Sequence, residues 1–240
     1  MRRRYIEKFI FRLVVLGFII FEYAVNAASF EVLKGMNFFR HFSLFNIIWV
    51  IWMVDMIQQL IPAKGVLTIG SQKQFLLHFI PSNISKTKDE LKKFIAVSGY
   101  AKLKVFVIWV LFVTALGLLK MQGVIGARGI LVIITLMYVA DLICVLFWCP
   151  FRVFFLKNRC CTTCTIFNWD HIMMFSPGIF VFGFFTWSLF VMSAIVFILW
   201  EVYFFIHPER FWEETNIALK CENCTEELCG KRLHVQSFKA

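Results

Sequence analysis

Residues 129–177 read GILVIITLMYVADLICVLFWCPFRVFFLKNRCCTTCTIFNWDHIMMFSP. The stretch opens on an apolar run, 130–148, in which Asp141 is the one charged residue. A run of this length can cross a bilayer, and it must be helical there because lipid offers no partner to a free backbone N–H group. A basic loop with several cysteines follows. The stretch therefore predicts a membrane span followed by a loop whose basic residues and cysteines are candidates for function.

Composition extends this interpretation to the whole chain of 240 residues. It is 60% hydrophobic and 17% charged, whereas a soluble domain has about 45–50% apolar and about 25% charged residues. We predict an all-α, polytopic helical integral membrane protein with about five transmembrane helices over residues 1–206, and a polar C-terminal tail at 207–240. The predicted spans lie at about 9–30, 42–61, 105–119, 130–148 and 178–206.

The net charge of +10 would suggest a nucleic-acid partner in a soluble protein. Here the basic residues lie between the apolar runs, so they indicate membrane topology and anionic lipid headgroups, and no nucleic acid. Segment 62–104 carries eight of the lysines. Within it, Thr87 and Glu90 have the spacing of a capping box. They predict a helix that lies in the headgroup region and runs directly into the third span.

The distribution of Lys and Arg predicts a cytoplasmic N-terminus. With five spans, the segments on that side hold 16 of these residues and the opposite segments hold 9. We interpret 178–206 as one long, tilted helix, which places the C-terminal tail on the opposite side. The basic first residues and Val25-Asn26-Ala27 also fit a cleavable signal peptide. Short loops without sorting signals favour a prokaryotic plasma membrane.

The loop at 149–172 contains Cys160, Cys161 and Cys164. Such spacing suits a metal site, and Cys161 with Cys164 suits a redox-active pair. Lys157 and Arg159 stand just before it, and nearby positive charge favours thiolate. Cysteines at a membrane boundary also serve as small apolar residues, so three interpretations remain open.

The tail repeats the metal-ligand pattern with Cys221, Cys224, Cys229 and His234. Three soft ligands and an imidazole form a four-coordinate set of the kind that zinc prefers. A disulfide with one free thiol is an alternative. If the tail and the cysteine loop lay on one face of the membrane, their cysteines could together hold one metal ion or an iron–sulfur cluster.

Three carboxylates fall near the middle of predicted spans: Glu22, Asp55 and Asp141. Charged groups are costly there and usually face the protein interior. If the three carboxylates lay close together in the folded protein, they would form a route for a proton or a cation. Hydrogen bonds that hold helices together explain them equally well. Downstream, Asp170-His171 could be an acid–base pair or the start of a helix.

No nucleotide-binding, metalloprotease or serine-hydrolase motif is present in the sequence. The leading hypothesis is a membrane protein with metal-binding cysteine clusters, more plausibly non-enzymatic, that acts with a membrane-protein partner in sensing or assembly. The first alternative is a proton- or cation-coupled transporter or channel subunit that uses the carboxylates. The second is a membrane thiol–disulfide oxidoreductase.

Overall fold

A computed structural model describes residues 2–40, 42–62, 67–82 and 87–224. Over these residues the chain is all-helical and contains no strand, which confirms the predicted class. The α-helices are α1 (Arg2–Val25), α2 (Leu44–Leu60), α3 (Ile69–Gln72), α4 (Lys88–Met121), α5 (Ala127–Leu146), α6 (Asp170–Phe175) and α7 (Phe184–Ile206). A π-helical turn, η4, covers Phe151–Leu156. The 3₁₀ turns are η1 (Ala27–Leu33), η2 (Asn37–Phe39), η3 (Leu76–His78), η5 (Cys161–Thr163), η6 (Phe167–Trp169), η7 (Ser176–Phe180), η8 (Pro208–Arg210), η9 (Ile217–Leu219) and η10 (Cys221–Asn223).

Three described helices are long and apolar enough to cross a membrane: α4, α5 and α7. A fourth is added if α1 and η1, which bend by 117° at their junction, count as one span. The 17 residues of α2 are apolar, but at 1.5 Å per residue they are short for a hydrocarbon layer of about 30 Å. The apolar helices are compatible with a membrane protein, while the predicted five spans are not confirmed by length and composition.

The longest helix, α4, begins where the sequence predicts. The amide and hydroxyl of Thr87 both donate to the Glu90 carboxylate at 3.0 Å, which completes the capping box. The helix then continues for 34 residues, so the basic segment and the third predicted span form one element. Lysines of its first turns are exposed, and their contact with anionic headgroups remains a prediction. Farther along, the Lys102 ammonium lies 2.8 Å from the Glu201 carboxylate and ties α4 to α7.

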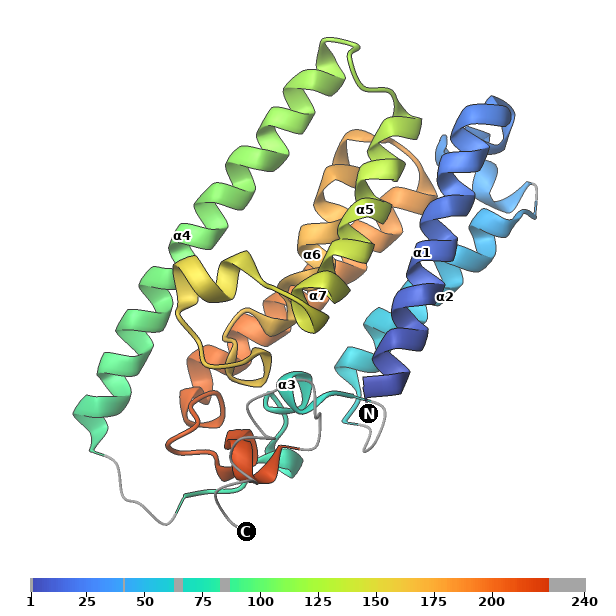
Figure 1. Cartoon of the computed structure of the whole chain (residues 1–240). Coiled ribbons are helices and arrows are strands. Elements are labelled where there is room, and N and C mark those ends of the chain that lie inside the picture. Colours follow the sequence, from blue (N-terminus) through green and yellow to red (C-terminus); the bar gives the residue numbers. More distant parts are fainter. Residues whose placement is uncertain (1, 41, 63–66, 83–86, 225–240) are drawn as a thin grey trace.

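The five long helices form a bundle in which α4 stands at one side and α1 with α2 at the other (Figure 1). Between α5 and α7, the short helix α6 and the turn η7 lie inside the bundle. At one end of the bundle, Gln59 in the last turn of α2 hydrogen-bonds Asp170 at the start of α6. At the other end, the amide of Phe184 donates to the Gly35 carbonyl at 2.8 Å. Residues 170–183 therefore pass from one end to the other.

This crossing corrects the prediction of one helix over 178–206. Pro177 lies in the first turn of η7, and α7 begins only at Phe184, after an extended Gly183. The crossing covers about 30 Å, counted from the rise of each helix type and of extended chain. Irregular backbone at membrane depth is tolerated where protein covers it, and α6 and η7 are mostly buried.

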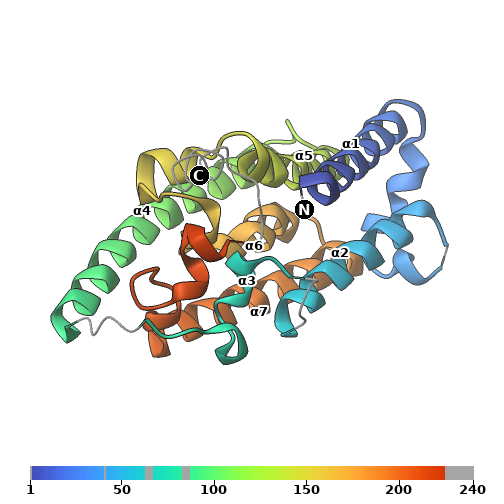
Figure 2. The same ribbon diagram turned by 60° about the horizontal axis from the view of Figure 1, so that its bottom comes forward.

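The added crossing also bears on the tail, whose side of the membrane stays a prediction. The residues after α7 return to the end of the bundle where α1 begins (Figure 2). There the Arg210 guanidinium donates to the Gln74 carbonyl at 3.0 Å, and Arg159 of the cysteine loop lies 2.6 Å from Glu213. The tail, up to Cys224, and the cysteine loop thus share one end of the molecule.

The shared end gives a topology prediction. In proteoliposomes, a cysteine introduced at Arg4 in a cysteine-free background and a cysteine retained at Cys221 should react with a membrane-impermeant maleimide from the same side. A control cysteine at Gly123, in the turn between α4 and α5, should react from the opposite side. Labelling of positions 4 and 221 from opposite sides would contradict the crossing by residues 170–183.

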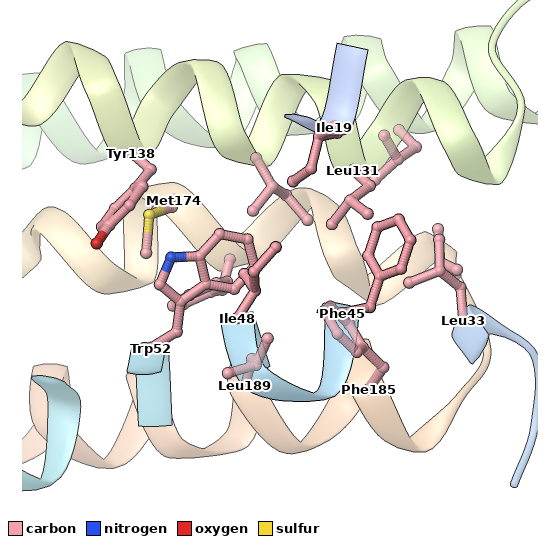
Figure 3. Packing of buried hydrophobic residues seen from close by; sticks show 14 of the residues in the cluster. Ile19, Leu33, Phe45, Ile48, Trp52, Leu131, Tyr138, Met174, Phe185 and Leu189 are labelled. Atoms are coloured by element: carbon pink, nitrogen blue, oxygen red, sulfur yellow. The ribbon is translucent and has the colours of Figure 1, made fainter. Parts of the chain in front are cut away.

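The apolar core lies between α1, α2, α5, α6 and α7. Trp52 of α2 is 1% exposed and stands at its centre, with its ring against those of Tyr138, Phe175 and Phe185 (Figure 3). Large aromatic pairs of this kind prefer edge-to-face contacts. Because Phe175 belongs to the irregular crossing, the core fixes that segment to the long helices.

Gly183 allows the close approach that joins η1 to α7. A Cβ atom at this position would lie 1.9 Å from the carbonyl oxygen of Leu33, which is backbone and cannot turn away. We expect Gly183→Ala to lower the free energy of unfolding by about 1–3 kcal/mol, as overpacking does. Gly126→Ala is the control, because nothing lies within 4 Å of its Cβ. Equal thermal unfolding of the two variants in detergent would contradict the tight contact.

Candidate functional site

A cavity of about 240 Å³ lies within the end of the bundle where α1 begins and where α2 and α5 finish. Side chains from α1, α2, α3, α4, α5, α6 and the cysteine loop line it. Charged and sulfur-containing groups that are far apart in the sequence meet here. The charged and thiol-bearing residues among those that line it are Lys8, Arg12, Asp55, Asp141, Arg152, Asp170, Cys144, Cys149, Cys161 and Cys164.

Arg12 and Asp141 form the shortest ion pair of the cavity. The guanidinium Nη1 lies 2.6 Å from Asp141 Oδ2 and also donates to the Tyr138 carbonyl at 2.5 Å. Its Cζ lies 4.0 Å from the centre of the Tyr138 ring. The Arg12 side chain is 10% exposed and the Asp141 side chain is 28% exposed, and both residues line the cavity. This pair fixes α1 against α5.

A second set of charges lies beside the first. His171 Nε2 is 3.5 Å from Asp55 Oδ2, and His171 Nδ1 is 3.2 Å from Asp170 Oδ1. The imidazole thus stands between two carboxylates, one from α2 and one from α6. Gln59 Nε2 donates to the other oxygen of Asp170 at 3.4 Å. An imidazole between two carboxylates can hold a proton and pass it across the cavity wall.

Four thiols, those of Cys144, Cys149, Cys161 and Cys164, also line the cavity. Cys144 occupies the last turns of α5, and Cys149 follows the helix end, so that their two thiols face each other within hydrogen-bonding reach. The amide of Arg152 lies 3.5 Å from the Cys149 sulfur. The Cys161 thiol lies 3.9 Å from the Cys144 carbonyl oxygen. The dithiol made by Cys144 and Cys149 is therefore built by a helix end and the turn after it.

The thiols of the loop differ sharply in acidity. The hydrogen bond from Cys144 and those from the amides of Arg152 and Phe151 lower the pKa of Cys149 to about 6, although burial acts the other way. Burial raises the pKa of Cys161 to about 12, and that of Cys164 to about 11. These shifts favour the thiolate form of Cys149 and the neutral thiol form of Cys161 and Cys164.

Lys73 holds the cysteine loop in place from outside the cavity. Its side chain is 1% exposed, and its ammonium donates to the carbonyls of Thr162, at 3.1 Å, and Cys164. The ring centre of Trp200 lies 5.3 Å from the same nitrogen. Burial lowers the pKa of Lys73 to about 8, while the neighbouring Cys164 and Cys160 oppose the shift.

Of the three predicted intramembrane carboxylates, the structure brings two together. Asp55 and Asp141 line the cavity. Glu22 lies on α1 about 15 Å beyond Arg12 by helix rise, and it does not line the cavity. Its Oε2 is buried and makes no hydrogen bond to the described residues.

Among the predicted thiols, Cys161 and Cys164 line the cavity, whereas the Cys160 sulfur lies 2.9 Å from the Thr162 hydroxyl. Cys221 is the first residue of the short turn η10 and Cys224 directly follows it, whereas Cys229 and His234 lie outside the described residues. Within the described part of the chain, no three or more His, Cys, Asp or Glu side chains are grouped to hold a metal ion. The zinc and iron–sulfur expectations remain predictions.

Sequence reasoning missed several members of the cavity. Asp170 is the first residue of α6, as the helix-start interpretation predicts, although Trp169 is the N-cap and no side chain caps the helix. From the sequence, Arg12 contributes only to the count of basic residues that predicts the topology, and Cys149 has no assigned role. A usable signal was present: Arg12 stands inside the apolar run of 9–30, where a charge needs a partner.

Comparison with known protein families, with curated proteins and with solved structures gives no match for this chain.

Proposed function

We propose that this chain is an integral membrane thiol–disulfide oxidoreductase, with Cys149 as the attacking thiolate and Cys144 as the resolving thiol. One observation carries the proposal: Cys144 and Cys149 both line the cavity at the end of α5, where the hydrogen bond from Cys144 and those from two following amides lower the pKa of Cys149. A thiol that is ionised at ambient pH attacks a disulfide efficiently. The pair replaces Cys161 and Cys164, which the sequence alone favours.

The reaction proceeds in two exchanges. The Cys149 thiolate attacks one sulfur of a small disulfide, whose S–S bond breaks as a mixed disulfide forms. The departing thiolate takes up a proton and leaves. Cys144, deprotonated in the step, then attacks the Cys149 sulfur and expels the second thiol. Two electrons have passed to the substrate, and Cys144 and Cys149 are joined by a disulfide.

A trapping experiment tests the proposal. Purified full-length Cys144→Ser protein is incubated at pH 7 with 2-hydroxyethyl disulfide, a molecule small enough for the cavity. We expect a stable mixed disulfide on Cys149, mapped by mass spectrometry of peptides, and no such adduct on Cys149 in the wild-type protein after the same time. Modification of Cys160 or Cys161 alone would overturn the assignment of Cys149.

Proton or cation transport is the second candidate, favoured by the meeting of Asp55 and Asp141 at one cavity. Coupled transport requires a carboxylate that exchanges its counter-ion, and Arg12 already pairs with Asp141. In proteoliposomes, Asp141→Asn should abolish proton-coupled flux if transport is the function. Unchanged flux in a folded variant would remove this candidate.

The metal prediction for the tail is separate from both candidates. Metal content per chain, measured on protein purified without a metal-affinity tag, tests it. About one zinc or iron, lost in Cys221→Ser/Cys224→Ser, would support a metal-binding accessory role with a membrane-protein partner.

A further inference from the structure

A second pair of thiols lines the cavity and takes no part in the proposed exchange. It consists of Cys161 and Cys164. The Cys161 thiol lies 3.9 Å from the carbonyl oxygen of Cys144. Burial raises the pKa of Cys161, and the negative charges of Cys164 and Cys149 raise it further. Because such effects fall off with distance, the second pair is a neighbour of the Cys144–Cys149 dithiol.

The backbone of the second pair suits a disulfide. In the turn η5, the Cys164 amide donates to the Cys161 carbonyl at 3.0 Å. A turn closed in this way keeps the Cα atoms of residues three apart within about 7 Å. A disulfide needs a Cα separation of about 4.4–6.8 Å. The turn therefore allows Cys161 and Cys164 to be joined with little movement of the backbone.

The buried ammonium of Lys73 holds this turn in place. It donates to the Thr162 carbonyl at 3.1 Å and to the Cys164 carbonyl. Burial raises the pKa of Cys164, and the positive charge of Lys73 opposes the rise. Negative charge that forms on the Cys164 sulfur during an exchange is therefore stabilised by a cation that is already in place.

The two pairs differ in how well their reduced form is stabilised. The hydrogen bond from Cys144, with those from the following amides, lowers the pKa of Cys149, so ionisation favours its reduced form. Burial raises the pKa of both Cys161 and Cys164. A pair whose reduced form is stabilised makes the more oxidising disulfide. Electrons therefore pass from the second pair to a Cys144–Cys149 disulfide.

We propose that Cys161 and Cys164 are a second redox pair, which reduces the Cys144–Cys149 disulfide inside the cavity. This inference rests on the proposed thiol–disulfide function and gives that site an internal electron donor. Cys161 loses its proton and attacks the Cys144 sulfur, and Cys149 leaves as a thiolate. Cys164 then attacks the Cys161 sulfur, and Cys144 leaves with the proton of Cys164. One S–S bond has replaced another, two electrons have moved between the pairs, and one proton has been released.

The test maps disulfides in reduced, full-length protein after one equivalent of 2-hydroxyethyl disulfide is added at pH 7. Samples are quenched with acid at intervals and alkylated, and the linked peptides are counted by mass spectrometry. Cys149→Ser removes the entry point, whereas Cys161→Ser/Cys164→Ser removes the second pair alone. Cys160→Ser is the matched control in the same loop, because its sulfur contacts the Thr162 hydroxyl.

We expect wild-type protein and Cys160→Ser to end with about ten times more Cys161–Cys164 than Cys144–Cys149 disulfide. In Cys149→Ser the Cys161–Cys164 disulfide should form about tenfold more slowly or less, because neutral thiols react poorly with the added disulfide. In Cys161→Ser/Cys164→Ser the disulfide should stay between Cys144 and Cys149.

Wild-type protein that keeps its disulfide between Cys144 and Cys149 would overturn the second pair and leave the proposed function standing. Equal rates of Cys161–Cys164 linkage in wild type and Cys149→Ser would also overturn it. The mixed disulfide on Cys149 in Cys144→Ser decides the proposed function separately. If that adduct and both disulfides failed to form in folded protein, the two proposals would fall together.

Discussion

Cys149→Ser should lower the rate of exchange with a small disulfide by about a thousand-fold or more, the scale seen when a nucleophile is removed from its site. A hydroxyl in this place is neither ionised at neutral pH nor able to form a mixed disulfide. The measurement is thiol release from 2-hydroxyethyl disulfide by reduced, full-length protein. Because sulfur and oxygen differ little in size, the variant should keep the fold.

The matched control for this prediction is Cys160→Ser, in which the same atom is exchanged in the same loop but outside the cavity. Its rate should stay within about twofold of wild type, since its sulfur takes no part in the proposed steps. The opposite pattern would contradict the assignment. If Cys161→Ser/Cys164→Ser lost exchange while Cys149→Ser retained it, the CxxC pair of the sequence would be the active one.

Arg12→Leu should lower the free energy of unfolding by about 3 kcal/mol, because it leaves the Asp141 carboxylate buried without its cation. This is the lower end of the range for breaking a buried pair, since the Asp141 side chain is 28% exposed. Loss of the hydrogen bond to the Tyr138 carbonyl adds to the effect. Thermal and denaturant unfolding in detergent, followed by tryptophan fluorescence, measure it.

The double variant Arg12→Leu/Asp141→Leu is the control that isolates the uncompensated charge. Replacing both partners of a buried ion pair with apolar residues is often neutral or stabilising, so the double variant should unfold closer to wild type than Arg12→Leu does. A double variant less stable than both single variants would show that the pair itself, and not the orphaned carboxylate, determines the stability.

Much of the fold follows from composition and periodicity. Long apolar runs with few charges locate the long helices, and the Thr87–Glu90 capping box locates the start of α4. The crossing by residues 170–183 escapes such reasoning, because it has no continuous apolar helix. Its fit depends on Gly183 meeting the Leu33 carbonyl, which are 150 residues apart, and only the folded chain brings them together.

The sequence predicts that carboxylates and thiols are the functional groups, but it does not predict which of these residues line the cavity. Asp55 and Asp141 could be named because a carboxylate in an apolar run is conspicuous. Cys149 could not, since its acidity arises from the thiol of Cys144 and from the amides of the following turn. The CxxC spacing drew attention to Cys161 and Cys164, whose burial keeps them protonated at neutral pH.

The central claim is that Cys149 is the ionised thiol of a cavity that it shares with Cys144. Site-resolved alkylation of the intact protein between pH 4.5 and pH 9 (on the order of a dozen pH values), read out by mass spectrometry, tests it most directly. We expect the Cys149 rate to reach half of its plateau near pH 6 and to exceed the rates of Cys161 and Cys164 at pH 7. A Cys149 that reacts only above pH 8, or after Cys161, would contradict the claim.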